Sequence, residues 1–262
     1  MNKPEIGLSM LYCLGEPFKK MTEHLIKAET AYIEIVDDGF HTLNKQRVSM
    51  LKNVGESHGL KYSVHAPFAD INIASPSKPM LKVMLKRLEK SISYASDLNA
   101  YVWVFHPGLE TGVSMFYPGM SWLQNLKTAR LLLKIASDYG VKIAIENVPE
   151  PYPFLMMSVE DFTKFYDEFN EDIGLAFDVG HANLNGQIER FLMVFTDRIV
   201  HIHAHDNQGK SDQHLGIGYG NIDWKKVANL LKRISYDKLV IIESFEHIEE
   251  SMHKLKQLFA KF

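Results

Sequence analysis

Short apolar or β-branched runs alternate along this chain with longer stretches in which apolar residues recur at helical spacing. The runs predict strands at residues 6–12, 31–37, 60–66, 101–107, 141–147, 173–179, 199–206 and 238–245. The stretches between and after them predict helices near residues 17–29, 44–58, 78–98, 121–139, 158–169, 187–195, 223–234 and 247–260. Gly59 and Gly140 follow helical stretches, as helix-ending glycines do, and Ser158 and Asp223 stand where N-caps are expected.

The order of these elements predicts the fold class. Strands that alternate with helices are typical of a parallel sheet with helical crossovers. Eight such units in about 250 residues are the number that closes a (β/α)8 TIM barrel. The rival is an open doubly wound sheet, which carries a glycine-rich phosphate-binding turn after its first strand. The first strand here leads into CLGEP, without that pattern. We therefore predict one α/β TIM-barrel domain over residues 1–262.

Charge, cysteine content and apolar runs indicate which partners and which compartment to expect. The chain has 29 basic and 32 acidic residues, a net charge of −3, and no long run of one sign. Neither nucleic acid nor a membrane is indicated as a partner by charge, although a local basic cleft stays possible. Cys13 is the single cysteine and cannot form an internal disulfide, which fits a reducing compartment. Without a signal-peptide pattern or a long apolar span, a cytoplasmic protein is expected.

Side chains that can bind metal recur at the predicted strand ends. They are His65, His106, Glu146, Asp178 with His181, His203 and Glu243, and the loop after the seventh strand adds Asp212 and His214. In a parallel barrel all these positions lie on one rim, where barrel active sites form. Carboxylates gathered there would repel one another unless a cation separates them. A single histidine at a strand end is usually a hydrogen-bonded loop residue, so the prediction depends on their coincidence.

The stretch HIHAHD at residues 201–206 places three histidines on one face of a strand. That face points into the lumen of a barrel, so His201 should lie deepest and be packed and hydrogen-bonded. His205 and Asp206 are candidates for orienting the metal ligands. Asn147 and Lys210 are further candidates for orienting ligands or contacting substrate, although a solvated loop also accounts for Lys210.

The number of ions separates two kinds of chemistry. Glu146, Asp178, His203 and Glu243 suffice for one ion, and imidazole with carboxylate suits zinc, manganese or iron. The five remaining candidates would allow up to three ions, with Glu146 as a bridge. Multinuclear sites favour phosphate-ester displacement. A single ion with flanking carboxylates, here Glu146 and Glu243, suits aldose–ketose isomerisation or epimerisation.

The segments SVHAPF, VFHPG, AIEN, AFDVGH, HAHD, DQHLGIGYGNIDW and IIES resemble motifs of the xylose isomerase-like barrel superfamily. That superfamily includes sugar isomerases and epimerases and the endonuclease IV family. The endonuclease resemblance implies a zinc ion on His65, His106 and Glu146. It implies a second on Glu146, Asp178, His203 and Glu243, and a third on His181, Asp212 and His214. The epimerase resemblance implies one ion, manganese or another divalent metal, with Glu146 and Glu243 moving a proton.

Three segments depart from the endonuclease pattern. The segment after Glu146 is NVPEPYPFLMMS instead of glycine-rich, the sixth strand ends in DVGH instead of Asp-Thr-Cys-His, and five residues separate Asp206 from Asp212. The predicted rim loops offer few cations for a DNA backbone, namely Lys78, Lys210 and Arg190. The ligand set predicts a multinuclear zinc hydrolase of phosphate esters, with abasic sites in DNA as one candidate substrate. A single-metal sugar or sugar-phosphate isomerase is the alternative, and a non-catalytic barrel with a structural ion is a third. Substrate and oligomeric state stay open.

Overall fold

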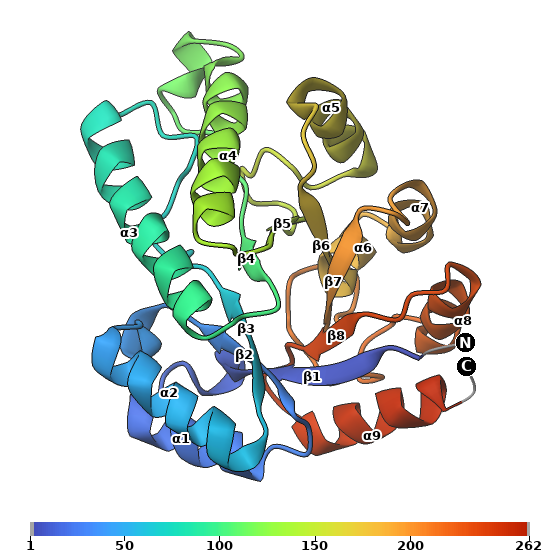
Figure 1. Ribbon diagram of the computed structural model, residues 1–262. Coiled ribbons are helices and arrows are strands. Elements are labelled where there is room, and N and C mark those ends of the chain that lie inside the picture. The colour runs from blue at the N-terminus through green and yellow to red at the C-terminus, as the bar shows by residue number, and fades with distance from the viewer. Residues whose placement is uncertain (1–2, 261–262) are drawn as a thin grey trace.

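The chain forms a closed barrel of eight parallel strands with helices on the outside, described for residues 3–260 by a computed structural model (Figure 1). The strands are β1 (Glu5–Ser9), β2 (Tyr32–Val36), β3 (Lys61–His65), β4 (Trp103–Phe105), β5 (Ile143–Glu146), β6 (Gly174–Asp178), β7 (Ile199–Ala204) and β8 (Leu239–Ile242). Each strand pairs with its neighbours in sequence, and β8 closes the sheet against β1. The predicted fold class is confirmed.

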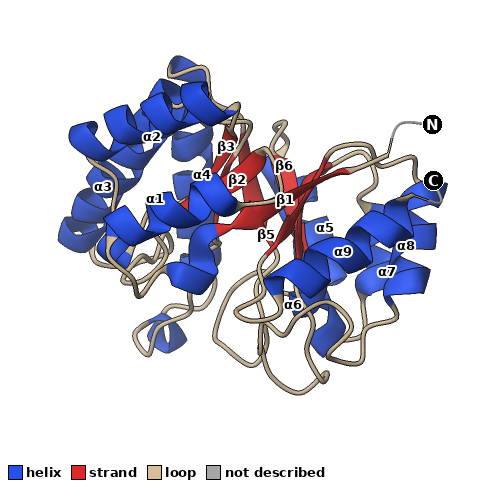
Figure 2. Ribbon diagram, turned by 90° about the horizontal axis from the view of Figure 1, so that it is seen from below, coloured by secondary structure: helices blue, strands red, loops and turns tan. Residues whose placement is uncertain are grey.

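The helices surround the strands in chain order (Figure 1), and Figure 2 shows them on both sides of the strands. They are α1 (Phe18–Lys27), α2 (Lys45–His58), α3 (Lys78–Asp97), α4 (Met120–Asp138), α5 (Val159–Phe169), α6 (Val179–Leu184), α7 (Ile188–Val194), α8 (Trp224–Arg233) and α9 (Ile248–Phe259). Short 3-10 helices occupy Met10–Cys13, Gly39–His41 and Ser114–Phe116. Among the described residues, no helix is both long and apolar enough to cross a membrane.

The structure departs from the sequence prediction at the end of the first strand and directly after the sixth, each time for a local reason, and the other strands are two to four residues shorter than predicted. The first strand ends at Ser9 instead of residue 12, because the Ser9 hydroxyl accepts the amide of Leu11 and starts a 3-10 helix. The short helix α6 was not predicted and begins directly after β6, where the carboxylate of Asp178 accepts the amide of His181 at 2.7 Å. One side chain therefore ends a strand and caps a helix at the predicted metal site.

The predicted helix caps are confirmed. Gly59 ends α2 with a φ of 67°, and Gly140 follows α4 with a φ of 68°, a left-handed conformation that glycine adopts without a Cβ clash. Asp223 caps α8 by accepting the amide of Lys226. Ser158 and Asp161 form a reciprocal capping box at the start of α5.

Replacing Ser158 with alanine should lower the free energy of unfolding by about 1 kcal/mol, because the Asp161 amide loses its acceptor at the start of α5. Urea denaturation would measure the change. Ser158→Thr is the matched control, because its hydroxyl can still accept the Asp161 amide and donate to the Asp161 carboxylate, and it should stay close to the parent protein. Equal losses in both variants would contradict a capping role.

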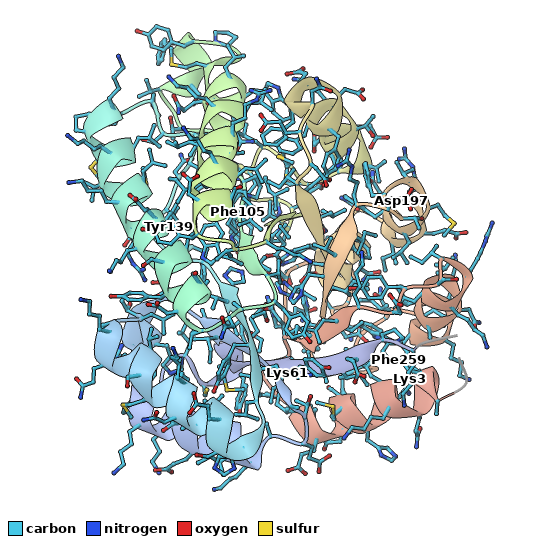
Figure 3. The ribbon with its side chains drawn as sticks, in the orientation of Figure 1. Lys3, Lys61, Phe105, Tyr139, Asp197 and Phe259 are labelled. Carbon is cyan, nitrogen blue, oxygen red and sulfur yellow. The ribbon has the colours of Figure 1, made fainter. Side chains whose placement is uncertain are left out.

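Side chains alternate between the helices and the lumen along each strand. Trp103 and Phe105 of β4 point outward into the layer between sheet and helices, and Figure 3 labels Phe105 there. Small side chains fill one part of the lumen, namely Val102, Val104, Ala144 and Ala176. Val200 packs with them because a register shift between β6 and β7 interrupts the alternation just before His201. Along each strand, every second side chain points into the lumen, and this alternation continues to the carboxyl end of the strand.

Candidate metal centre

All nine predicted metal ligands lie at the carboxyl ends of the strands. His65, Glu146 and Asp178 are the last residues of β3, β5 and β6, and His106 and Glu243 directly follow β4 and β8. The others come from α6, β7 and the loop after β7, namely His181, His203, Asp212 and His214. The candidate ligands on the strands occupy lumen-facing positions. Because the barrel is closed, their side chains point into one volume although they are far apart in the sequence.

Glu146 lies at the centre of this volume. Its Oε2 atom lies 3.3 Å from Nε2 of both His65 and His106. Its Oε1 atom lies 3.0 Å from Nδ1 of His203, the same atom that Glu243 approaches at 3.6 Å. The two oxygens of one carboxylate thus face two groups of side chains, an arrangement that suits a bridging ligand.

A further group lies beside the first two. Asp212 Oδ2 lies 3.4 Å from His181 Nε2 and 3.2 Å from His214 Nε2. Asp178 contributes to the second group with Oδ2, 3.9 Å from His203 Nδ1. The structure therefore brings the predicted residues together in three clusters that share the membership expected from the sequence motifs.

Backbone carbonyls orient three of the imidazoles. Nδ1 of His65 lies 2.9 Å from the carbonyl of Ala66, and Nδ1 of His214 lies 2.7 Å from the carbonyl of Glu243. Nδ1 of His181 lies 2.8 Å from the carbonyl of Asn147. A ring that donates from Nδ1 presents the Nε2 lone pair, and all three Nε2 atoms point toward carboxylates of the clusters.

Buried polar atoms without a hydrogen-bond partner show that these clusters fit a cation. They include Glu146 Oε2, Asp178 Oδ2, His181 Nε2, Asp212 Oδ1 and Glu243 Oε1. An unsatisfied buried polar atom costs about 1–3 kcal/mol, more when charged, and here five of them converge. A donor set of imidazoles and carboxylates is one that zinc, manganese and iron accept.

The clusters also perturb one another's protonation. Burial disfavours the charged form of Glu146, but His203, His106 and His65 outweigh it and hold the pKa of that carboxyl well below its usual range. Burial alone would lower the pKa of His65, yet Glu146 raises it to about 9. Burial likewise opposes the charge of His181, whereas Asp178 and Asp212 raise its pKa to about 10. Both shifts favour the protonated imidazole in the metal-free protein, so each ring must lose a proton before its Nε2 atom can bind a metal ion.

Zinc binding at neutral pH should consequently release protons, because a ligating imidazole must be neutral. A raised pKa favours the protonated form, so the apparent zinc affinity should rise with pH until about 9 to 10, where His65 and His181 deprotonate. Calorimetry in buffers of different ionisation enthalpy would measure the protons released. An affinity and a proton count that do not change with pH would contradict this assignment.

The four residues predicted to orient ligands or contact substrate lie in different surroundings. Asn147 is buried and joins the ends of β5 and β6, since its amide donates to the Asp178 carbonyl and accepts the Asp178 amide. Asp206 is buried but accepts the amides of Gly218 and Ile222 and the Trp224 indole, so it anchors the loop between β7 and α8. Lys210 is exposed in that loop, and His205 lies beside the third cluster.

Glu34 on β2 was not predicted from the sequence. It is fully buried in the lumen, where Oε2 accepts His201 Nε2 at 2.9 Å and the Ser63 hydroxyl at 3.1 Å. Its Oε1 atom lies 3.1 Å from Nε2 of His203, whose other ring nitrogen, Nδ1, faces Glu146. An acidic residue inside the apolar run YIEIV was the available signal. His201 is packed and hydrogen-bonded, as predicted.

A cavity of about 370 Å³ opens over the clusters. Its floor includes His65, His106, Glu146, His181, Asp212, His214 and Glu243, and its walls are mostly apolar, from Leu11, Val36, Phe68, Ile71, Leu109, Pro149, Tyr152 and Phe154. Among the described residues, no lysine or arginine lines it. A larger cavity of about 860 Å³ lies at the amino ends of the strands and contains none of the nine candidate ligands.

The loops after β4 and β5 build the apolar wall together. Leu109 pairs with Phe154 as an isolated bridge, and the amide of Glu110 donates to the carbonyl of Pro153 at 2.7 Å. Gly108 packs so closely on Ala74 that a side chain there would strike its backbone. The proline-rich segment after Glu146 is therefore part of a closed wall, which limits the width of any substrate.

Comparisons with known proteins agree with this geometry. The sequence pattern of the family described as xylose isomerase-like TIM barrel matches residues 24–259. An uncharacterized protein of Methanocaldococcus jannaschii is 31% identical over 98% of this chain and 89% of its own length. A solved structure described as a D-tagatose 3-epimerase-like protein has a TM-score of 0.92 and 31% identity, covering 98% of this chain and 97% of its own. A probable endonuclease 4 of Thermoplasma acidophilum is 23% identical over 75% of this chain and 70% of its own length.

Proposed function

Because this chain belongs to the xylose isomerase-like TIM barrel family of enzymes, we propose that it is a metal-dependent isomerase or epimerase of a small sugar or sugar derivative. This was the alternative in the sequence analysis. Greater similarity to the epimerase-like structure than to the endonuclease, in both identity and coverage, supports it over the hydrolase.

The observation that carries the proposal is a pair of carboxylates at the floor of a small cavity. Glu146 and Glu243 both line the cavity, and each lies within 3.6 Å of the same His203 nitrogen. In this proposal one carboxylate takes the proton from the substrate carbon beside the carbonyl. The other then delivers a proton to the opposite face of that carbon, so the product is an epimer with the same atoms.

Glu146, Asp178, His203 and Glu243 would hold the reacting ion, which when bound polarises the carbonyl and hydroxyl oxygens of the substrate. Zinc and manganese both suit this donor set. Two further residues orient these ligands. The Asn147 side chain accepts the backbone amide of Asp178, and the Glu34 carboxylate contacts Nε2 of His203, the ring nitrogen that faces away from Glu146. The apolar walls exclude water from the reacting carbon.

The dimensions and charge of the cavity support a small, uncharged substrate. Its volume lies at the lower end of the range of about 300–1,000 Å³ that is typical of small-molecule pockets. Duplex DNA would require several cations for its phosphates. Lys78 and Lys210 are exposed on rim loops, and Arg190 pairs with Glu160 at 2.7 Å, so none of the three predicted cations lines the cavity.

The test is proton exchange in heavy water. Protein loaded with manganese or zinc is incubated with a panel of ketohexoses and ketopentoses, and products are followed by NMR. We expect deuterium at the carbon beside the carbonyl together with an epimer or isomer. If no sugar of the panel incorporates deuterium faster with the metal-loaded protein than with the metal ion alone, the proposal is contradicted.

Phosphate-ester hydrolysis is the second candidate, and one observation favours it. Five candidate ligands lie outside the four-residue group, namely His65, His106, His181, Asp212 and His214, and a sugar epimerase with one ion does not need them. The same preparations should therefore be assayed on a simple phosphodiester and on an abasic-site duplex. Zinc-dependent cleavage without sugar exchange would favour the hydrolase, with abasic DNA or a small phosphorylated molecule as substrate.

A further inference from the structure

The cavity of about 860 Å³ at the amino ends of the strands, here called the lower cavity, enters the barrel from the face opposite the metal clusters. Charged side chains surround its opening, namely Glu5, Lys142, Asp172, Asp197, Arg198, Asp237 and Lys238. Figure 3 labels Asp197 on this face, directly before β7. Among the described residues that line the cavity, His201 is the only fully buried polar side chain, so it marks the inner end.

His201 has one ring nitrogen without a partner. Its Nε2 atom lies 2.9 Å from Oε2 of Glu34, and because an ionised carboxylate only accepts hydrogen bonds, Nε2 carries the proton. In the neutral ring the other nitrogen, Nδ1, is then an acceptor, and it is buried without a hydrogen bond. A buried acceptor costs free energy unless a donor reaches it, and Nδ1 is the nitrogen that Glu34 leaves for a molecule in the lower cavity.

Small side chains leave room for such a molecule at the starts of three strands. Val102, Gly174 and Val200 line the cavity just before or within β4, β6 and β7. Gly174 lies so close to Val200 that a Cβ atom at position 174 would be 2.5 Å from its Cγ2 atom. A larger residue at position 174 would therefore push Val200 aside, and the lower cavity depends on this glycine.

Acidic side chains predominate at the opening. Four of the seven charged residues that line it are acidic, and three are basic. Two of the basic side chains already have partners, since Arg198 pairs with Asp172 at 2.7 Å and Lys238 donates to the carbonyl of Ile199 at 2.8 Å. The opening therefore attracts a cation more than an anion. A protonated amine meets both requirements of the cavity, because it is a cation and a hydrogen-bond donor.

We propose that the lower cavity binds a small organic cation, a primary ammonium compound, which donates a hydrogen bond to Nδ1 of His201. The carboxylates at the opening offset the charge of this compound. The site is separate from the cavity over the metal clusters, because the two cavities share no lining residue. The proposal is therefore independent of which reaction the chain catalyses.

The imidazole of His201 also links this site to the metal clusters. Glu34 contacts His201 with Oε2, and its Oε1 atom lies 3.1 Å from Nε2 of His203, whose Nδ1 faces Glu146. A donor on Nδ1 of His201 keeps the proton on Nε2 and so holds Glu34 in place. Glu34 in turn favours the proton on Nε2 of His203, which leaves Nδ1 as the atom that can bind an ion. The amine and the metal ion should consequently strengthen each other's binding.

Ligand-observed NMR titration of the full-length, zinc-loaded protein tests the site, because zinc occupies the carboxylates at the other end of the barrel. The probes are propylamine and 1,4-diaminobutane, with glycerol as the uncharged donor and acetate as the anion. We expect both amines to bind, glycerol to bind more weakly and acetate not to bind. Failure of both amines to bind, or a preference for glycerol or acetate, would overturn the proposal.

His201→Gln separates the roles of the two ring nitrogens. The glutamine amide can still donate to Glu34, but it places no acceptor where Nδ1 was. We expect amine affinity to fall by at least about tenfold, because a hydrogen bond to a charged group is lost. Parent-like amine affinity in a folded His201→Gln variant would contradict the role of Nδ1.

The double variant Asp197→Asn, Asp237→Asn tests the opening and leaves His201 unchanged. We expect amine affinity to fall by about two- to fivefold at low salt and less at high salt, because exposed charges act weakly and are screened. Glu56→Gln with Glu89→Gln is the matched control, since it removes two exposed carboxylates from α2 and α3, outside the cavity lining. Equal losses of affinity in the two double variants would refute a specific role of the opening.

Zinc titration with and without 1,4-diaminobutane tests the link to the metal clusters. We expect the amine to raise zinc affinity by about fivefold or more, and zinc to raise amine affinity by the same factor. In His201→Gln this mutual effect should disappear. Bound amine that leaves the zinc affinity of the parent protein unchanged would overturn the link. Every readout is a binding constant, so a failed sugar assay leaves these results interpretable.

Discussion

Glu146→Gln should lose metal from two of the three clusters and reduce turnover by about a thousandfold or more. One carboxylate faces His65 and His106 with Oε2 and His203 with Oε1, so its loss affects both clusters at once. The amide also cannot take a proton from substrate, a function worth about 10²–10⁴-fold in rate. Elemental analysis of the purified variant and the heavy-water exchange assay would measure the two effects.

The matched control is Glu89→Gln, an exposed position on α3, which should keep its metal content and turnover. Circular dichroism would establish that Glu146→Gln is folded. Full metal loading and full turnover in Glu146→Gln would contradict the bridging role. Full loading with lost turnover would restrict Glu146 to proton transfer and leave the bridge without support.

Glu34→Gln should lower both stability and metal affinity, although position 34 lies below the cavity. Burial disfavours the charge of Glu34, but His203 and His201 outweigh it and hold the pKa of that carboxyl well below its usual range. Removing one charge of a buried ion pair typically costs about 3–5 kcal/mol. The loss here should fall toward the lower end of that range, because His203 keeps Glu146 and Glu243 as acidic neighbours. Since Glu34 holds His203 from behind, metal affinity should also fall by about 10–100-fold.

Urea denaturation of the metal-free variant and zinc titration would measure these two losses separately. Ser63→Ala is the control, because it removes one hydrogen bond to Glu34 and leaves both histidine contacts in place. It should cost no more than about 3 kcal/mol and keep the metal affinity of the parent protein. Parent-like zinc affinity in Glu34→Gln would refute the positioning of His203 by Glu34.

Local sequence patterns predicted the elements and the rim on which the ligands lie. Short apolar or β-branched runs, the N-cap at Ser158 and the glycine at 59 act over a few residues, so they can be predicted directly from the sequence. Ligands at strand ends could be predicted because a parallel barrel brings all carboxyl ends to one face. The boundary at Ser9 and the helix α6 were missed, since a single capping side chain decided each.

Contacts across the barrel were decided only by the tertiary structure. Glu34 and His201 are 167 positions apart, and no local pattern links them until the sheet closes. The width of the cavity likewise depends on how the loop at Leu109 pairs with the loop at Phe154. Its small volume and apolar walls support the proposed sugar isomerisation or epimerisation over phosphate-ester hydrolysis, as the greater similarity to the epimerase-like structure also does.

The sequence by itself thus determined the barrel and which residue types lie at its rim. Strands, helices and helix caps depend on the pattern of residues that are close together in the sequence. Tertiary structure decided which donor atoms share a cluster, because that depends on strand register and on ring orientation by backbone carbonyls. His205 illustrates both. Its place on the lumen face of β7 follows from alternation, whereas its contact with Asp212 requires the space that Gly180 leaves on a neighbouring helix.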